Sequence, residues 1–101
     1  MIARLPVLGA SPGIFVYPGT TDGAILRNQN FLEIYCTGLG VGQPVTVNLG
    51  GRSIVPSWSG PHPAYPGLYQ VNVEIPAGLT GEQPVSLEVA GNRSNEVKAH
   101  L

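Results

Sequence analysis

The sequence contains few charged residues, and this scarcity excludes several classes of protein. Asp, Glu, Lys and Arg make up 11% of the 101 residues, against about a quarter in a typical soluble domain. Five basic residues oppose six acidic ones, and the formal net charge is −1. No face can be basic enough to follow a nucleic-acid backbone or to bind an anionic membrane surface. We therefore expect neither nucleic-acid binding nor membrane insertion.

Long stretches without glycine or proline are also missing. The chain contains 14 glycines and 10 prolines, and the longest stretch free of both is 24–37. A helix of average length has almost no place to form, whereas short strands joined by turns fit this spacing. The single cysteine, Cys36, excludes a disulfide within the chain. Because it alternates onto an apolar face, we expect a buried free thiol.

The N-terminal residues lack the uninterrupted hydrophobic run of a signal peptide or a membrane span. Pro6 and Gly9 divide the apolar residues into pieces that are too short for either. The chain is then either cytosolic or a piece of a longer secreted protein. The low charge and a surface rich in Thr, Ser, Asn and Gly favour the second interpretation. We expect an extracellular or cell-surface location.

Alternation of apolar and polar residues is the strongest positive signal. It runs through 31–38, 44–49, 68–75 and 84–90, and such a period of two is typical of half-buried strands. The apolar members of these runs form the predicted core: Leu32, Ile34, Val45, Val47, Leu49, Tyr69, Val71, Val73, Ile75, Val85, Leu87 and Val89. The polar members of 68–75 are almost uncharged, which raises the question of what that face does.

Short strands separated by turns predict the fold class. The candidate segments are 2–8, 13–17, 24–27, 31–38, 44–49, 52–58, 68–75, 84–90 and 95–101. Their spacing of roughly 8–12 residues predicts an all-β protein, an immunoglobulin-like β-sandwich of seven to nine strands without significant helix. Pro56 cannot donate to a ladder, so 52–58 is expected to be an edge or bulged strand. Residues 1–10 are interpreted as an N-terminal extension or linker strand, and 11–101 as the sandwich.

Aromatic side chains gather among the prolines of the segment that follows. Exposed rings of Trp58, Tyr65 and Tyr69 can stack on sugar rings or on a protein partner. Alternatively, Trp58 plugs one end of the sandwich. The exposure of Trp58 discriminates between these readings, since a buried indole indicates a scaffold and an exposed one a binding site. The candidate ligand or partner contacts are Trp58, His62 and Tyr65.

No cluster of residues shows the division of roles that catalysis needs. Asp22 is the single aspartate, and the glutamates are scattered along the predicted strands. Nothing in the pattern gives His62 or His100 a nucleophile or an orienting carboxylate. Zinc and calcium spacings are absent, and the glycines of 38–42 lack the Lys-Ser/Thr pair of a phosphate loop, which favours a turn. We expect no enzyme activity, no metal and no cofactor.

Several short motifs occur in an order that resembles a known family. These motifs are "SPGIF", "GAIL", "IYCTGLG", "VTVNLGG", "PGLYQVNVEIPAGL" and "PVSLEVAGNRSNEV", spread over 11–101. The chain resembles the immunoglobulin-like, IPT/TIG-like uncharacterized domain at the C-termini of large secreted acidobacterial (Solibacter-type) proteins. The resemblance implies an immunoglobulin-like fold, an extracellular setting and no assigned catalytic residues. The loops after "AIL" and "TGLG" are shorter here than is usual in that family.

These observations together predict a non-enzymatic extracellular module that serves structure or adhesion. Its expected partners are other domains or copies of itself. One alternative is a filament subunit that adds its N-terminal strand, with Ile2, Leu5, Val7 and Leu8, to the sheet edge of a neighbouring copy. Pairing of that strand within its own chain is also open. The other alternative is a carbohydrate-binding module that uses exposed aromatic side chains.

Overall fold

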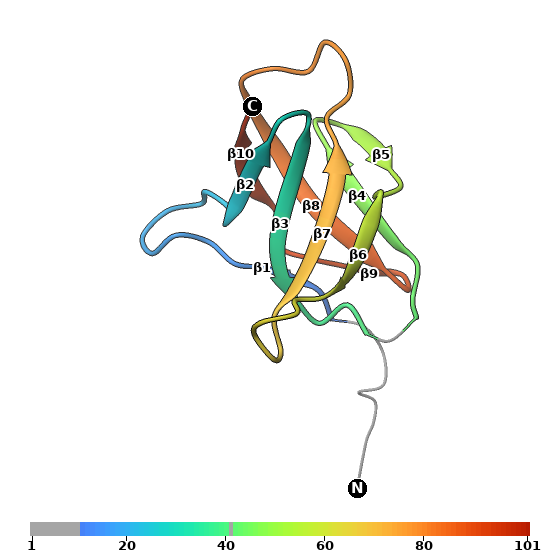
Figure 1. The fold of residues 1–101 in the computed structure, drawn as a ribbon. Helices are drawn as coiled ribbons and strands as arrows, with labels where there is room; N and C mark the ends of the chain where they lie inside the picture. The colour runs from blue at the N-terminus through green and yellow to red at the C-terminus, as the bar shows by residue number, and fades with distance from the viewer. Residues whose placement is uncertain (1–10, 41) are drawn as a thin grey trace, which may run out of the picture.

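Two antiparallel β-sheets packed face to face make up the part of the chain that the computed structural model describes, residues 11–40 and 42–101 (Figure 1). The predicted strand 2–8 lies outside the described residues. The strands within them are β1 (Gly13–Ile14), β2 (Ile25–Asn28), β3 (Phe31–Thr37), β4 (Val45–Leu49), β5 (Arg52–Ile54), β6 (Trp58–Pro61), β7 (Tyr69–Glu74), β8 (Glu82–Val89), β9 (Asn92–Arg93) and β10 (Val97–His100). These residues contain no helix, so the predicted all-β sandwich is confirmed.

Each sheet has a central pair of longer strands and shorter strands at its edges. The first sheet has the order β1-β3-β7-β6, and β2 also pairs with β3, so that β1 and β2 lie end to end along one edge of β3. The second sheet has the order β10-β8-β4-β5, with β9 beside β8. Figure 1 shows the first sheet in front of the second, with the N-terminal side of β7 at the lower end.

The core lies between the two sheets, as the alternation predicts. In the first sheet Leu32 pairs with Val73, and in the second Val47 pairs with Leu87, and all four side chains are buried. Eleven of the twelve predicted core residues are buried. The exception is Tyr69, which is only partly buried and packs against the margin of the core. Burial of branched side chains on both inner faces is what stabilises a sandwich of this size.

The segment 52–58, predicted as one edge or bulged strand, forms two strands that belong to different sheets. β5 is the edge of the second sheet, and β6 is the edge of the first. Residues 55–57 cross from one sheet to the other. Pro56 lies in this crossing, where its missing N–H interrupts no ladder. The prediction of a single strand is therefore wrong, although its placement at an edge is right.

The opposite side of the sandwich is closed by the connection between β1 and β2. The backbone N–H of Gly23 donates to the carbonyl of Lys98 at 2.9 Å, and the N–H of Lys98 donates to the carbonyl of Thr21 at 2.8 Å. The outer edge of β10 is thus paired by this loop. Among the described strands, β2, β5, β6 and β9 each pair with a single neighbouring strand, and all four are short. Such short edges offer little backbone for the addition of another strand.

Candidate binding face

The two outer faces of the sandwich differ in composition. The strands of the first sheet expose Leu26, Phe31 and Trp58, which are 50%, 38% and 47% accessible. Phe15 is also exposed, and it joins the same face because the buried Ile14 before it points inward. Among the described strands of the second sheet, no large apolar side chain is exposed. Its outward positions carry polar and charged residues such as Asn48, Glu88 and Lys98.

Trp58 lies on the outer face of β6 and does not plug the end of the sandwich. Trp58 and Gly60 are two residues apart and therefore share one face of the strand. A Cβ built on Gly60 would lie 3.0 to 3.6 Å from three atoms of the six-membered indole ring. The ring consequently covers Gly60 and leaves its other side to solvent. By the criterion set above, this exposure favours a binding site over a scaffold role for Trp58.

Amide side chains of β7 lie directly beside this indole. Asn72 pairs with Trp58 and Gln70 pairs with Gly60 in the register of β6 and β7. The Nε2 of Gln70 donates to the Oδ1 of Asn72 at 2.8 Å, which holds the two amides in place. Because each amide carries both a carbonyl and an NH₂ group, this bond leaves an acceptor on Gln70 and a donor on Asn72 for a ligand.

The outer face continues from β7 onto β3. Glu33 pairs with Asn72, and Tyr35 pairs with Gln70. The hydroxyl of Tyr35 donates to the Oε1 of Glu33 at 3.2 Å. Burial raises the pKa of Tyr35, and the hydrogen bond to Glu33 and the charge of that carboxylate raise it further. Tyr35 is thus held as a neutral phenol with its ring on the face. A hollow lined by Asn28, Gln29, Phe31, Glu33, Ser57 and Asn72 adjoins it.

His62 and Tyr65 border this face at its lower end. The ring centroid of His62 lies 6.1 Å from that of Tyr35 and 5.3 Å from that of Tyr65. The Nδ1 of His62 accepts a hydrogen bond from the backbone N–H of Ala64 at 3.1 Å, so the ring is fixed by its own loop. Of the candidate contacts, Trp58, His62 and Tyr65 therefore belong to one face, and His62 acts there as a packing group.

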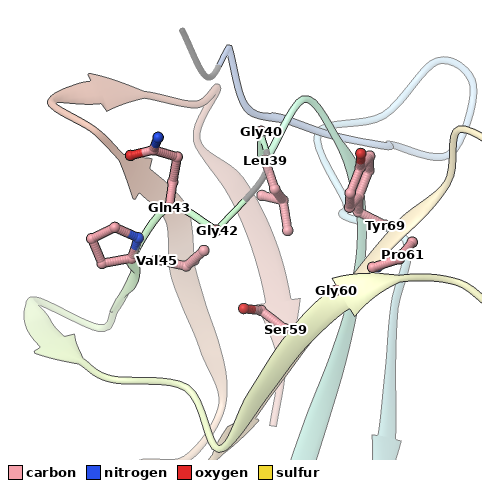
Figure 2. Close-up of a pocket in the computed structure, with 10 residues that line it drawn as sticks. Leu39, Gly40, Gly42, Gln43, Val45, Ser59, Gly60, Pro61 and Tyr69 are labelled. Atoms are coloured by element: carbon pink, nitrogen blue, oxygen red, sulfur yellow. The ribbon is translucent and has the colours of Figure 1, made fainter. Parts of the chain in front are cut away.

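Tyr69 lies apart from the other aromatic residues. It alternates with Gln70 and so points to the inner side of β7, where it lines a pocket of about 580 Å³ at the lower end of the sandwich (Figure 2). The pocket lies between the connection from β3 to β4 and the strand β6. Its lining is Leu39, Gly40, Gly42, Gln43, Pro44, Val45, Ser59, Gly60, Pro61 and Tyr69. This lining carries no charged group. The sequence-based grouping of Tyr69 with Trp58 and Tyr65 as stacking rings is wrong.

Cys36 is a buried free thiol, as the alternation predicts. Its side chain is fully buried between the sheets, and its Sγ donates to the carbonyl of Tyr69 at 3.7 Å. Burial raises the pKa of this thiol to about 12. A thiol with so high a pKa is a poor nucleophile at neutral pH.

One pair of titratable residues brought together by the fold had no signal in the sequence. The Nε2 of His100 lies 3.0 Å from the Oδ1 of Asp22, although 78 positions separate the two residues. Both side chains are exposed, at 61% and 40%. The pair lies where the loop joins β10, away from the aromatic face. Within 11–40 and 42–101, no three His, Cys, Asp or Glu side chains are grouped to hold a metal ion.

The geometry defines a β-sandwich with one aromatic outer face, which carries the carboxylates of Glu33 and Glu74, and one outer face of polar and charged residues. None of the described residues form a helix long and apolar enough to cross a membrane. The chain matches no family model, no curated protein and no solved structure. The immunoglobulin-like family resemblance therefore stays a prediction that rests on the order of short motifs.

Proposed function

We propose that this chain is a non-enzymatic adhesion module of a secreted or cell-surface protein, and that its aromatic face binds neutral carbohydrate. The observation that carries the proposal is the position of Trp58, whose indole covers Gly60 and faces solvent. Aromatic rings of this kind stack on the apolar C–H faces of sugar rings, while neighbouring polar groups bond to the hydroxyls. Gln70, Asn72 and Glu33 supply those polar groups here.

The chemistry of the face favours a sugar over a protein as the ligand. The centres of protein interfaces are also rich in aromatic residues and poor in charged ones, but they are packed as tightly as a protein interior. Here the aromatic rings alternate with amides and with the carboxylate of Glu33, which pairs across the strands with Asn72. A surface of this mixed kind suits a ligand that presents both C–H groups and many hydroxyls. The adjoining polar hollow beside Phe31 and Asn72 gives such a ligand further hydrogen-bonding partners.

The titratable groups of the aromatic face support a non-enzymatic role. The described titratable groups of the face are Glu33, Tyr35, His62, Tyr65 and Glu74. The ring of His62 lies tilted against the rings of two tyrosines. Glu33 accepts a hydrogen bond from the hydroxyl of Tyr35, and Glu74 accepts one from the side chain of Asn30. A glycosidase needs two carboxyl groups that flank one bond with distinct roles as acid and base or nucleophile. The arrangement gives Glu33 a binding role.

The test is retention of the purified protein on insoluble neutral polysaccharides, namely cellulose, chitin and mannan. We expect at least one of them to deplete the protein from solution, and Trp58→Ala to weaken that binding roughly tenfold, as the loss of one stacking contact of about 1.4 kcal/mol implies. Val55→Ala is the matched control, because Val55 is 81% exposed and lies outside the face. Its binding should equal that of the parent protein.

Failure of the folded protein to bind any of these polysaccharides would contradict the proposal. If the protein instead dimerised, and Trp58→Ala made it monomeric, the face would be a protein interface.

A further inference from the structure

Three positions of the first sheet lie in one register line across its strands, and the indole of Trp58, whose own backbone pairs with Asn72, reaches this line by covering Gly60. Gly60, under the indole of Trp58, pairs with Gln70, and Gln70 pairs with Tyr35. The backbone N–H of Phe15 donates to the carbonyl of Tyr35 at 3.1 Å, which places Phe15 next along the same line. We call Trp58, Gln70, Tyr35 and Phe15 the aromatic row. Strands lie about 4.8 Å apart, so the three steps of the row span about 14 Å.

The aromatic row has polar or aromatic borders on both sides. Asn72 and Glu33 lie one register step away on one side, and His62 lies on the other side beside Tyr35. Both ends of the row carry an exposed aromatic ring, since Trp58 and Phe15 are each 47% accessible. The middle carries the amide of Gln70 and the phenol of Tyr35. This sequence of stacking, hydrogen-bonding and stacking groups matches an elongated ligand better than a single sugar ring.

We propose that the aromatic row is an extended site for an unbranched neutral oligosaccharide, which lies across the strands with one sugar ring on Trp58 and another on Phe15. This inference rests on the proposed function of the face. Gln70 and Asn72 bond to the hydroxyls of the units between the two stacked rings. The length of the row sets the number of sugar units that contribute to affinity.

Charge determines that the ligand is neutral. The outward positions of the described strands of this sheet include two carboxylates, Glu33 and Glu74, and neither lysine nor arginine. The carboxylate of Glu33 lies beside the row, where it accepts hydrogen bonds from Tyr35 and Asn28. A chain of uronic acids would bring like charges to this carboxylate. The exposed Arg27 of β2 has an inward register position opposite Leu32, and its Nε donates to the carbonyl of Gln29.

The test is calorimetric titration of the protein with three series of oligosaccharides, made of glucose, of mannose or of N-acetylglucosamine. Each series runs from the disaccharide to the hexasaccharide. We expect the affinity to increase with chain length until the ligand spans the row and then to stay constant. Phe15→Ala should weaken binding of the hexasaccharide about tenfold and leave the disaccharide unaffected, whereas Trp58→Ala should weaken both. Thermal unfolding of each variant establishes that it is folded.

Leu26→Ala provides the matched control. Leu26 is exposed on the same face but pairs with Glu33, one register step from the line of Gly60, Gln70 and Tyr35 over which the ligand would lie, so its replacement should leave the hexasaccharide affinity unchanged. An equal loss with Leu26→Ala, or no dependence on chain length, would overturn the extended site while the carbohydrate-binding function stands. Tighter binding of an oligouronate than of the neutral chains would overturn the neutral ligand. Absence of binding to every oligosaccharide and polysaccharide would overturn both proposals.

Discussion

At the scale of single residues, the period of two determines which side chains meet the core and which meet solvent. Val71 and Val73 are fully buried, while Gln70 and Asn72 between them form part of the outer face. A shift of one residue in register would exchange these two sets. The same rule explains the orientation of the Tyr69 side chain. Tyr69 is two residues from Val71 and therefore points to the same inner side of β7, although it carries a hydroxyl group.

The loss of stability on truncation of Val73 tests this register. Val73 is fully buried and pairs with Leu32, so Val73→Ala leaves a cavity between the sheets. We expect the free energy of unfolding to fall by about 2 kcal/mol, within the range of core truncations. Denaturant unfolding measures it, and Val55→Ala on the exposed crossing should change it little. A loss for Val73→Ala below about 0.5 kcal/mol would contradict the register.

Cys36 should make stability depend on pH in the alkaline range. Its pKa rises from 9.0 to about 12 in the folded protein because burial disfavours the thiolate. The folded state therefore holds the proton more tightly, and this contribution is complete below pH 9 and is lost as the pH rises toward 12. The slope attributable to Cys36 is at most about 1.4 kcal/mol per pH unit.

The measurement compares urea unfolding of the parent protein and of Cys36→Ala at pH 8 and at pH 10.5. Other groups titrate equally in both proteins, so the difference between them isolates the thiol. We expect the stability advantage of the parent protein to shrink at the higher pH. Rapid reaction of the native protein with a thiol reagent at pH 8 would show instead that Cys36 is accessible.

At the scale of elements, connections that alternation does not encode join the strands into a sandwich. Asn95 makes two hydrogen bonds across the molecule: its Oδ1 accepts from the N–H of Ile14 at 2.8 Å, and its Nδ2 donates to the carbonyl of Ile14 at 3.0 Å. The side chain thereby behaves like a partner strand for the short β1. It connects the first sheet to the segment between β9 and β10 of the second sheet.

Replacement of Asn95 should loosen β1 specifically. Asn95→Ala removes both bonds to Ile14, and we expect a loss of about 1–2 kcal/mol in the free energy of unfolding. Hydrogen exchange should show faster exchange at the N–H of Ile14, while the N–H groups of β7 and β8 stay protected. Asn48→Ala is the control, because the Asn48 side chain bonds to Ser86 and Ser53 within the second sheet. Uniform acceleration across both sheets in Asn95→Ala would argue against a local tie.

Sequence patterns predict some of the strands and turns of this protein and leave others undetermined. The central strands β3, β4, β7 and β8 follow from alternation, and the hairpin at Gly50 and Gly51 follows from the positive φ that such a turn needs. The division of 52–58 between two sheets could not be predicted from the sequence. Pro56 predicts that the strand is interrupted, but it does not indicate which sheet the next strand joins. Nor could the aromatic row be predicted, because alternation gives the face of each residue and leaves open which strands are neighbours.

At the scale of the whole molecule, the two outer faces differ in charge and in exposed apolar surface. The second sheet carries outward polar and charged groups, including the ion pair of Lys98 with Glu82 at 3.6 Å. The first sheet exposes aromatic rings with few charges. With a net charge of −1, the protein exerts no strong long-range field on a ligand. The carbohydrate binding that we propose for the aromatic face must then depend on short-range stacking, apolar burial and hydrogen bonds.

The dependence of binding on salt concentration tests whether charged groups contribute to it. Binding driven by ion pairs weakens steeply with ionic strength, because exposed charges are screened beyond a Debye length of about 10 Å at 0.1 M. Stacking and hydrogen bonds to a neutral chain are not screened in this way, and apolar contacts do not weaken as salt increases. We therefore expect retention on the neutral polysaccharide to be almost the same at low salt and at molar sodium chloride. A tenfold fall in affinity over that range would mean that charged groups, such as those of the second sheet, provide the contact, and that the aromatic face is not the binding site.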